Sequence, residues 1–219
     1  LGFKVIELYK NTNISYSYIK NLRINLKFNK LERVAHAGGG YNNKTYTNSI
    51  EALNLNKKSY NYFEIDFYIN KDNELICSHN PEDQFIKKEI LLKKYNYTPC
   101  TLITLNNWLD DNPEKVIITD VKNNNYKALK IIRDNIINFN TKFIPQIYHP
   151  KEYESIKKLG FTNIILTLYR LNENENDLNY ILDAINNKEL YAITMSENFV
   201  LKGYGNKIKL QSIPTYAHT

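Results

Sequence analysis

Two histidines and three carboxylates lie at the ends of predicted strands in this 219-residue chain. His36 ends the run RVAH, and His79 ends the run ELICSH. Glu64 and Asp66 are two positions apart in YFEIDFYI, so both side chains project from one face of a strand. Asp120 occupies a similar position in KVIITDVK. Because imidazoles titrate near neutral pH and grouped carboxylates bind hard divalent cations, the pattern predicts acid–base groups beside a metal site.

Other polar residues fall at the same strand ends. Lys122 lies two positions after Asp120 and would share its face, where an ammonium could bind an anionic substrate. The glycines at 38 to 40 would let the backbone approach a ligand closely. Gln146 and His218 end two later strands. Each feature alone has an ordinary structural explanation, such as a surface ion pair or a solvated strand face. The hypothesis therefore depends on their joint occurrence.

The elements that must position these residues alternate between apolar runs of strand length and segments of helix length. We expect seven strands, at 34–37, 62–69, 115–121, 143–148, 163–169, 191–195 and 212–218, with a hairpin strand at 74–78. Continuously apolar strands between helices are typical of a parallel α/β sheet covered on both faces. Polar residues at several strand ends favour a TIM (β/α)8-type barrel over an open sheet. No eighth strand is visible, so we expect it to be missing or truncated.

The helices are predicted from caps and apolar spacing. Asn48 or Ser49 would cap a helix to Lys58, and Thr104 would cap a short helix containing Trp108. Later helices are expected at 126–139, where Leu129, Ile132, Ile136 and Ile137 share one side, at 152–159 before Gly160, at 177–186, and after Ser196.

Composition and length limit the alternatives. The net charge of +6 comes from lysines spread along the chain, so we expect no nucleic-acid partner, although attraction to anionic substrates or proximity to a membrane fits the charge. We expect an N-terminal extension at 1–32, with one strand at 22–28, and a single domain at 33–219. Cys77 and Cys100 are too few for a disulfide framework, and we expect free thiols. The oligomeric state stays open.

No apolar run reaches the roughly 20 residues of a membrane span. The chain begins at Leu1 without a methionine, so we expect that it was cut from something longer. Two compartments stay open: the cytoplasm, or the periplasm with a membrane anchor ahead of Leu1.

The motifs together resemble those of the glycerophosphodiester phosphodiesterases, which belong with the phosphatidylinositol-specific phospholipases C among TIM-barrel phosphodiesterases. The family pattern is H-R-G, then E-N-T, E-x-D, H-D and E-x-K. In this chain the matching segments read His36-Ala37-Gly38, Thr47-Asn48-Ser49, Glu64-Ile65-Asp66, His79-Asn80 and Asp120-Val121-Lys122. The segments KDNELICSHN and IPTYAHT are also similar to family segments. The resemblance spans residues 33–219 and is specific over 33–79 and 120–122.

The resemblance implies a metal-dependent phosphodiesterase. It assigns His36 and His79 as the acid–base pair, and a Mg²⁺ or Ca²⁺ ion to three carboxylates. The substrate would contact Lys122, Asn48 and Gly38, and the three metal ligands would be Glu64, Asp66 and Asp120.

The chain departs from the family pattern at three positions. Ala37 stands where the family has a phosphate-binding arginine, Thr47 replaces a glutamate, and Asp120 is shorter than the family glutamate. These changes favour a glycan or lipid phosphodiester over a small glycerophosphodiester. Two alternatives stay open: a phospholipase-C-like lyase that stops at a cyclic phosphate, and a non-catalytic barrel that serves as a binding or scaffold domain.

Overall fold

The computed structural model describes residues 33–171 and 177–218, and it contains seven parallel strands in one sheet. Their order is β1-β2-β4-β5-β6-β7-β8, and β3 pairs antiparallel with β2. The strands are β1 (Val34–Ala35), β2 (Tyr62–Ile69), β3 (Leu75–Cys77), β4 (Val116–Val121), β5 (Phe143–Ile147), β6 (Ile165–Thr167), β7 (Ala192–Ser196) and β8 (Thr215–His218). The architecture is a TIM-type α/β barrel, and within the described ranges no eighth parallel strand joins β8 to β1, as predicted.

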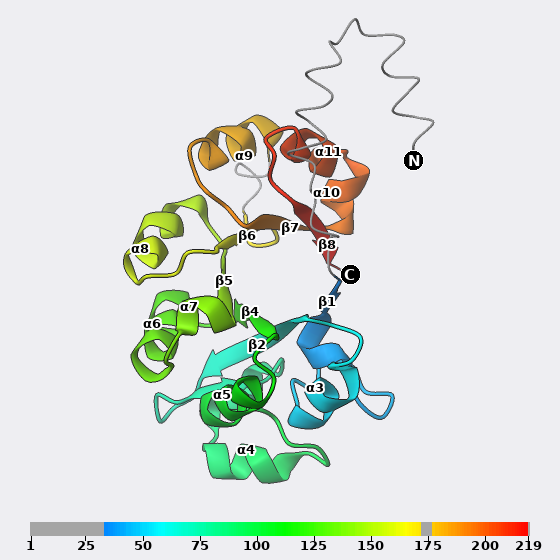
Figure 1. The fold of residues 1–219 in the computed structure, drawn as a ribbon, viewed down its shortest axis with the longest axis vertical. Helices are drawn as coiled ribbons and strands as arrows, with labels where there is room; N and C mark the ends of the chain where they lie inside the picture. Colours follow the sequence, from blue (N-terminus) through cyan, green and yellow to red (C-terminus); the bar gives the residue numbers. More distant parts are fainter. Residues whose placement is uncertain (1–32, 172–176, 219) are drawn as a thin grey trace, which may run out of the picture. The chain divides into compact units, whose positions relative to one another are not determined.

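Helices connect the strands and cover their outer side (Figure 1). The chain has short turns η1 (His36–Gly39), η2 (Pro81–Phe85) and η3 (Pro150–Glu152). The helices of the described ranges are α3 (Ile50–Asn56), α4 (Lys88–Lys94), α5 (Leu102–Asp111), α6 (Asn125–Asn135), α7 (Phe139–Lys142), α8 (Tyr153–Lys158), α9 (Leu178–Ile185), α10 (Glu197–Leu201) and α11 (Tyr204–Lys209).

Two helix predictions were wrong in detail. The cap of α5 is Thr101, whose hydroxyl accepts from the backbone N–H of Thr104, while the Thr104 hydroxyl accepts from the N–H of Thr101. This reciprocal pair is a capping box, so the predicted cap was the second member of the motif. Helix α6 ends at Asn135, and Ile137 is 82% exposed rather than part of the apolar face.

The strands bury apolar residues on both faces. Outward-facing residues such as Phe63, Ile65 and Phe67 of β2 pack in the large core shared with the helices. Inward-facing residues form a smaller cluster that includes Ile118, Ile144, Ile165 and Ala192. This alternation explains why the strands read as continuous apolar runs in the sequence.

The interior of the barrel holds a hydrogen bond between two tyrosines and a cavity. Tyr191, at the start of β7, donates a hydrogen bond of 3.0 Å to Tyr62, at the start of β2, although these strands are not neighbours in the sheet. A cavity of about 370 Å³ in the barrel is lined by residues of all seven parallel strands. Glu64 and Asp120 line this cavity, so the predicted site faces its hollow.

A disulfide joins Cys77 and Cys100, and the prediction of free thiols was therefore wrong. The two Cα atoms are 5.0 Å apart, which is ordinary for a disulfide. The backbone N–H of Cys77 donates to the carbonyl of Cys100, so the hairpin strand β3 is held against the segment before α5. Two cysteines cannot reveal this pairing from spacing alone, because it depends on tertiary contact.

Removing the disulfide is expected to lower the free energy of unfolding by about 3 kcal/mol, because it closes a loop with a sequence separation of 23 residues. The test is urea unfolding of the Cys77→Ser, Cys100→Ser double variant beside the wild type under oxidising conditions. A reductant should destabilise the wild type and leave the double variant unchanged. Equal stability of the two proteins without reductant would contradict the expectation.

Two further expectations concern a strand in the N-terminal extension and the absence of a membrane span. The predicted strand at 22–28 falls outside the described residues. None of the helices in the described ranges is long and apolar enough to span a bilayer.

Candidate active site

The HAGGG segment forms a tight turn directly after β1. Ala37 and the three glycines that follow have positive φ angles, and the amide of Asn56 donates to the carbonyls of residues 38, 39 and 40. At Gly39 a Cβ atom would lie 2.8 Å from the Asn56 side chain, so only glycine fits there. The turn aims the backbone N–H of Ala37 at Glu64, whose Oε2 accepts it at 2.8 Å.

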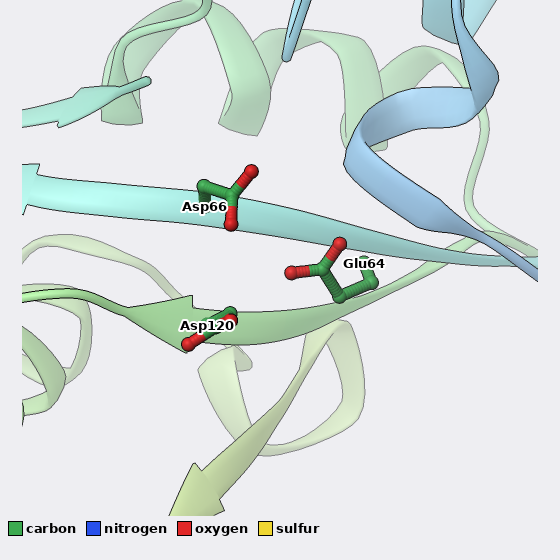
Figure 2. A group of neighbouring side chains, drawn as sticks. All are labelled: Glu64, Asp66 and Asp120. Atoms are coloured by element: carbon green, nitrogen blue, oxygen red, sulfur yellow. The ribbon is translucent and has the colours of Figure 1, made fainter. Parts of the chain in front are cut away.

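Three carboxylates converge inside the barrel (Figure 2). Glu64 and Asp66 come from β2, Asp120 comes from the neighbouring β4, and one oxygen from each lies within 4.8 Å of the others. The strand register explains this grouping, because Asp66 lies directly opposite Asp120. All three residues are buried, at 6%, 0% and 6% exposure.

Lys122 neutralises part of this acidic group. Its ammonium lies 2.5 Å from Asp66 Oδ1 and 2.7 Å from Asp120 Oδ2. Burial alone would lower the pKa of Lys122, but Asp120 and Asp66 raise it well above its usual value. Lys122 is therefore a permanent cation beside two carboxylates.

Asp120 is held by residues that follow β5 and β6. The Tyr148 hydroxyl donates to its Oδ1 at 2.5 Å, and the Tyr169 hydroxyl lies 2.8 Å from the same oxygen. Arg170 Nη2 is 3.8 Å from Asp120 Oδ1, and the guanidinium stacks 3.6 Å from the Tyr148 ring centre. Burial raises the pKa of Asp120, but Lys122 and the two tyrosines outweigh this and lower it.

Asn48 positions Asp66. Its amide nitrogen donates to Asp66 Oδ2 at 2.9 Å, and its Oδ1 accepts the backbone N–H of Asp66 at 2.9 Å. Asn48 is fully buried and adopts a φ of 47°, which asparagine tolerates better than most residues. Through these contacts the buried Asn48 side chain fixes the position of the Asp66 carboxylate.

The two histidines contact the same aromatic ring, that of Tyr46. His36 Nε2 is 3.6 Å from Glu64 Oε2, and the His36 ring contacts Tyr46 at 5.0 Å between centres. His79 contacts the same tyrosine at 4.4 Å. Both histidines are exposed, so solvent and substrate can reach them. The His36 side chain is 43% exposed, and the partial burial of its imidazole lowers its pKa, which favours its neutral form at pH 7.

The carboxylates fit a divalent cation. Glu64 Oε1 is buried and has no hydrogen-bond donor in the part of the chain that the structure describes. Burial, followed by the charges of Asp66 and Asp120, raises the pKa of Glu64 well above its usual value. A cation would relieve both the missing partner and the repulsion, and oxygen ligands of this kind are those that Mg²⁺ and Ca²⁺ prefer. The group can therefore hold a metal ion.

The fold resembles several solved structures. A candidate glycerophosphodiester phosphodiesterase from Galdieria sulphuraria has a TM-score of 0.69 at 14% identity, with 84% of this chain and 82% of that chain covered. A glycerophosphodiester phosphodiesterase from Parabacteroides distasonis ATCC 8503 has a TM-score of 0.66 at 13% identity, with 86% and 83% covered. A glycerophosphodiester phosphodiesterase from Thermotoga maritima has a TM-score of 0.62 at 15% identity, with 85% of this chain and 83% of that chain covered. No family model and no curated protein matches the sequence.

The chain has the fold of the glycerophosphodiester phosphodiesterases. The resemblance inferred from the motifs is therefore confirmed at the level of the fold. The phosphodiesterase fold brings together most of the residues selected from the sequence: His36, Asn48, Glu64, Asp66, His79, Asp120 and Lys122.

Three other predicted residues have different places. Gln146 lines the barrel cavity. Gly38 is buried, and the space beside its Cα faces Ala52 and Leu53, so it packs against α3. The His218 side chain lies outside the described part of the structure.

The sequence analysis missed Tyr46, Tyr148, Tyr169 and Arg170. The dipeptide Tyr169-Arg170 at the end of the predicted strand 163–169 was the available signal, since such positions lie at the mouth of the barrel. In a chain with 18 tyrosines, the residue type alone gave no reason to select the others.

Proposed function

We propose that the chain is a metal-dependent phosphodiester hydrolase of the glycerophosphodiester phosphodiesterase type. The observation that carries this proposal is the grouping of three buried carboxylates within 4.8 Å, with His36 beside them, in a barrel of that fold. A structural barrel has no need to bury three carboxylates beside a single lysine, because buried charge that is not fully paired is costly. This argues against a purely scaffolding role.

His36 and His79 are the acid and base in this proposal. A hydroxyl, from the substrate itself or from water, attacks phosphorus and gives its proton to His36, whose lowered pKa keeps the imidazole neutral. As the bond between phosphorus and the leaving oxygen breaks, that oxygen takes the electron pair and a proton from His79. Lys122 binds a phosphate oxygen beside the carboxylates.

Glu64, Asp66 and Asp120 would hold a divalent cation, Mg²⁺ or Ca²⁺. When bound, the cation would stabilise negative charge on the phosphate oxygens. A hydrogen bond orients each of these carboxylates for the cation. Asn48 orients Asp66, Tyr148 orients Asp120, and the Ala37 N–H orients Glu64. The substrate is a phosphodiester with a glycerol, lipid or glycan group.

The direct test uses bis(p-nitrophenyl) phosphate and a panel of glycerol, lipid and glycan phosphodiesters, with Mg²⁺, Ca²⁺ or a chelator. Metal-dependent release of a phosphomonoester, followed by phosphorus NMR, would support the hydrolase. A stable cyclic phosphate would identify the lyase instead. No turnover of any diester, together with no metal binding by calorimetry, would favour the non-catalytic barrel.

Arg170 is proposed to replace the phosphate contact that is lost at Ala37. Its side chain is 34% exposed, stacks on Tyr148 and donates to the Val121 carbonyl at 3.0 Å. A guanidinium has five N–H donors, so this contact leaves others available for a phosphate. It approaches the carboxylates from β6, whereas position 37 lies after β1.

Arg170→Ala is expected to raise KM for a phosphodiester by about tenfold or more, as a charged hydrogen bond is worth about 1.5–3 kcal/mol. Arg170→Lys should recover part of the loss, because lysine keeps the charge but not the planar stack. Steady-state kinetics measure both. Arg133→Ala is the control, since Arg133 pairs with Asp134 on α6, away from the site. An unchanged KM in Arg170→Ala would remove this assignment.

A further inference from the structure

A second cavity, of about 340 Å³, lies beside His79. Its lining includes Tyr46, Ser78, Asn80, Tyr95 and Tyr97, and we call it the tyrosine pocket. Tyr46 also contacts His36, which lines the barrel cavity. The tyrosine pocket is therefore adjacent to the candidate active site, and the two proposed acid–base residues each border one of the two hollows.

The wall of the tyrosine pocket is held by a buried carboxylate. Asp83 is 0% exposed, and it accepts from the Ser78 hydroxyl at 2.5 Å, from the Tyr95 hydroxyl at 3.0 Å and from the Lys94 ammonium at 2.5 Å. Asn80 is tied to the same group through its backbone N–H, which donates to Ser78 Oγ at 3.0 Å. The disulfide of Cys77 borders the pocket as well. The pocket is thus preformed.

The lining of the tyrosine pocket is aromatic and neutral. Apart from His79, the residues that line it carry no carboxylate, ammonium or guanidinium group, and tyrosine hydroxyls are neutral at pH 7. Tyr95 and Tyr97 stack at 4.9 Å with only 6° between their planes. Aromatic rings beside hydroxyl and amide groups suit a ligand that has both apolar C–H faces and hydroxyls.

A quaternary ammonium group also binds aromatic cages, but the charges here oppose it. The Lys94 ammonium lies 5.2 Å from the Tyr95 ring centre, and the Lys44 ammonium lies 5.6 Å from that of Tyr97. These two ring systems already face a cation each, and a second positive charge would be repelled. A neutral hydroxylated ligand avoids this cost.

We propose that the tyrosine pocket binds a neutral sugar or polyol, namely the alcohol that leaves the phosphodiester. This proposal rests on the proposed function for its role in catalysis. In the bond-breaking step, the leaving oxygen takes the phosphorus–oxygen electron pair and a proton from His79, which borders the pocket. The pocket therefore determines which alcohol the site accepts.

Binding is tested without turnover by saturation-transfer NMR, with methyl α-glucoside, myo-inositol and choline as separate probes at millimolar concentration. We expect saturation transfer to at least one neutral probe, and its loss in Tyr97→Ala. Tyr97 suits substitution because its contacts are the stack on Tyr95 and the nearby Lys44 ammonium. Tyr126→Ala is the matched control, since Tyr126 is an exposed tyrosine on α6. Transfer to choline alone, or equal transfer in wild type and Tyr97→Ala, would overturn the proposal.

Kinetics provide the second readout. Tyr97→Ala should reduce the preference for a hexosyl phosphodiester over a methyl phosphodiester by about three- to tenfold, the range of one aromatic contact, mainly through KM. Turnover with an unchanged preference would overturn the pocket's role and leave the hydrolase intact. Absence of turnover, with probe binding that Tyr97→Ala abolishes, would refute the hydrolase and support the pocket as a binding site.

Discussion

Replacing His36 with alanine is expected to slow phosphodiester cleavage by about 10²–10⁴-fold, the usual contribution of a general acid or base. His79→Ala should cause a loss of similar size, because the leaving oxygen would depart without a proton. In both variants kcat should fall more than KM rises, since proton transfer belongs to the transition state rather than to substrate binding. The measurement is a steady-state series with one phosphodiester at a saturating concentration of the cation.

The histidine variants need a control for folding and for loss of an imidazole in general. His149→Ala provides it, because His149 Nδ1 accepts from the backbone N–H of Lys151 and caps η3. Circular dichroism should show that the three variants keep the wild-type fold. A substrate with a p-nitrophenolate leaving group needs little protonation, so it should rescue His79→Ala more than His36→Ala. Full activity in either site variant would refute the corresponding assignment.

Much of the barrel could be predicted because local chemistry decides it. The bounds of β2 agree with the predicted 62–69, since an aromatic and β-branched run ends at a clear turn. The candidate metal ligands followed from the same strand: the period of two places Glu64 and Asp66 on one face. Asp120 joined them because parallel strands place their carboxyl ends at one edge, and the register sets it opposite Asp66.

What could not be predicted depends on tertiary contacts. The disulfide needs Cys77 of β3 to meet Cys100 before α5, and nothing in two isolated cysteines specifies this. Tyr148 reaches Asp120 across 28 positions and Tyr169 across 49, so no local pattern marks them. The contacts of Asp83 could not be predicted for the same reason, because the sequence does not show that this aspartate is buried.

Glu64→Gln is expected to weaken cation binding without destabilising the protein that lacks a cation. Burial and the charges of Asp66 and Asp120 raise the pKa of Glu64, so its ionised form is disfavoured in the folded state. Stability is therefore lost as pH rises above the usual glutamate pKa towards the raised folded value, and a neutral glutamine removes this loss. Losing a ligand should weaken Mg²⁺ or Ca²⁺ binding by at least the roughly 10–100-fold typical of changes around metal sites.

Thermal unfolding measures the effect on cation binding separately from the effect on the stability of the cation-free protein. A cation at about 100 times its Kd adds about 2.7 kcal/mol to wild-type stability, which is about 5–10 °C in Tm for a domain of this size. Glu64→Gln should show a Tm at least equal to that of the cation-free wild type and a clearly smaller rise at the same concentration of Mg²⁺ or Ca²⁺. Glu154→Gln, at an exposed position of α8, should behave like the wild type. A large loss of stability in Glu64→Gln without cation would mean that the carboxylate is structural, because an ion-binding triad should relax when one of its repelling charges is removed.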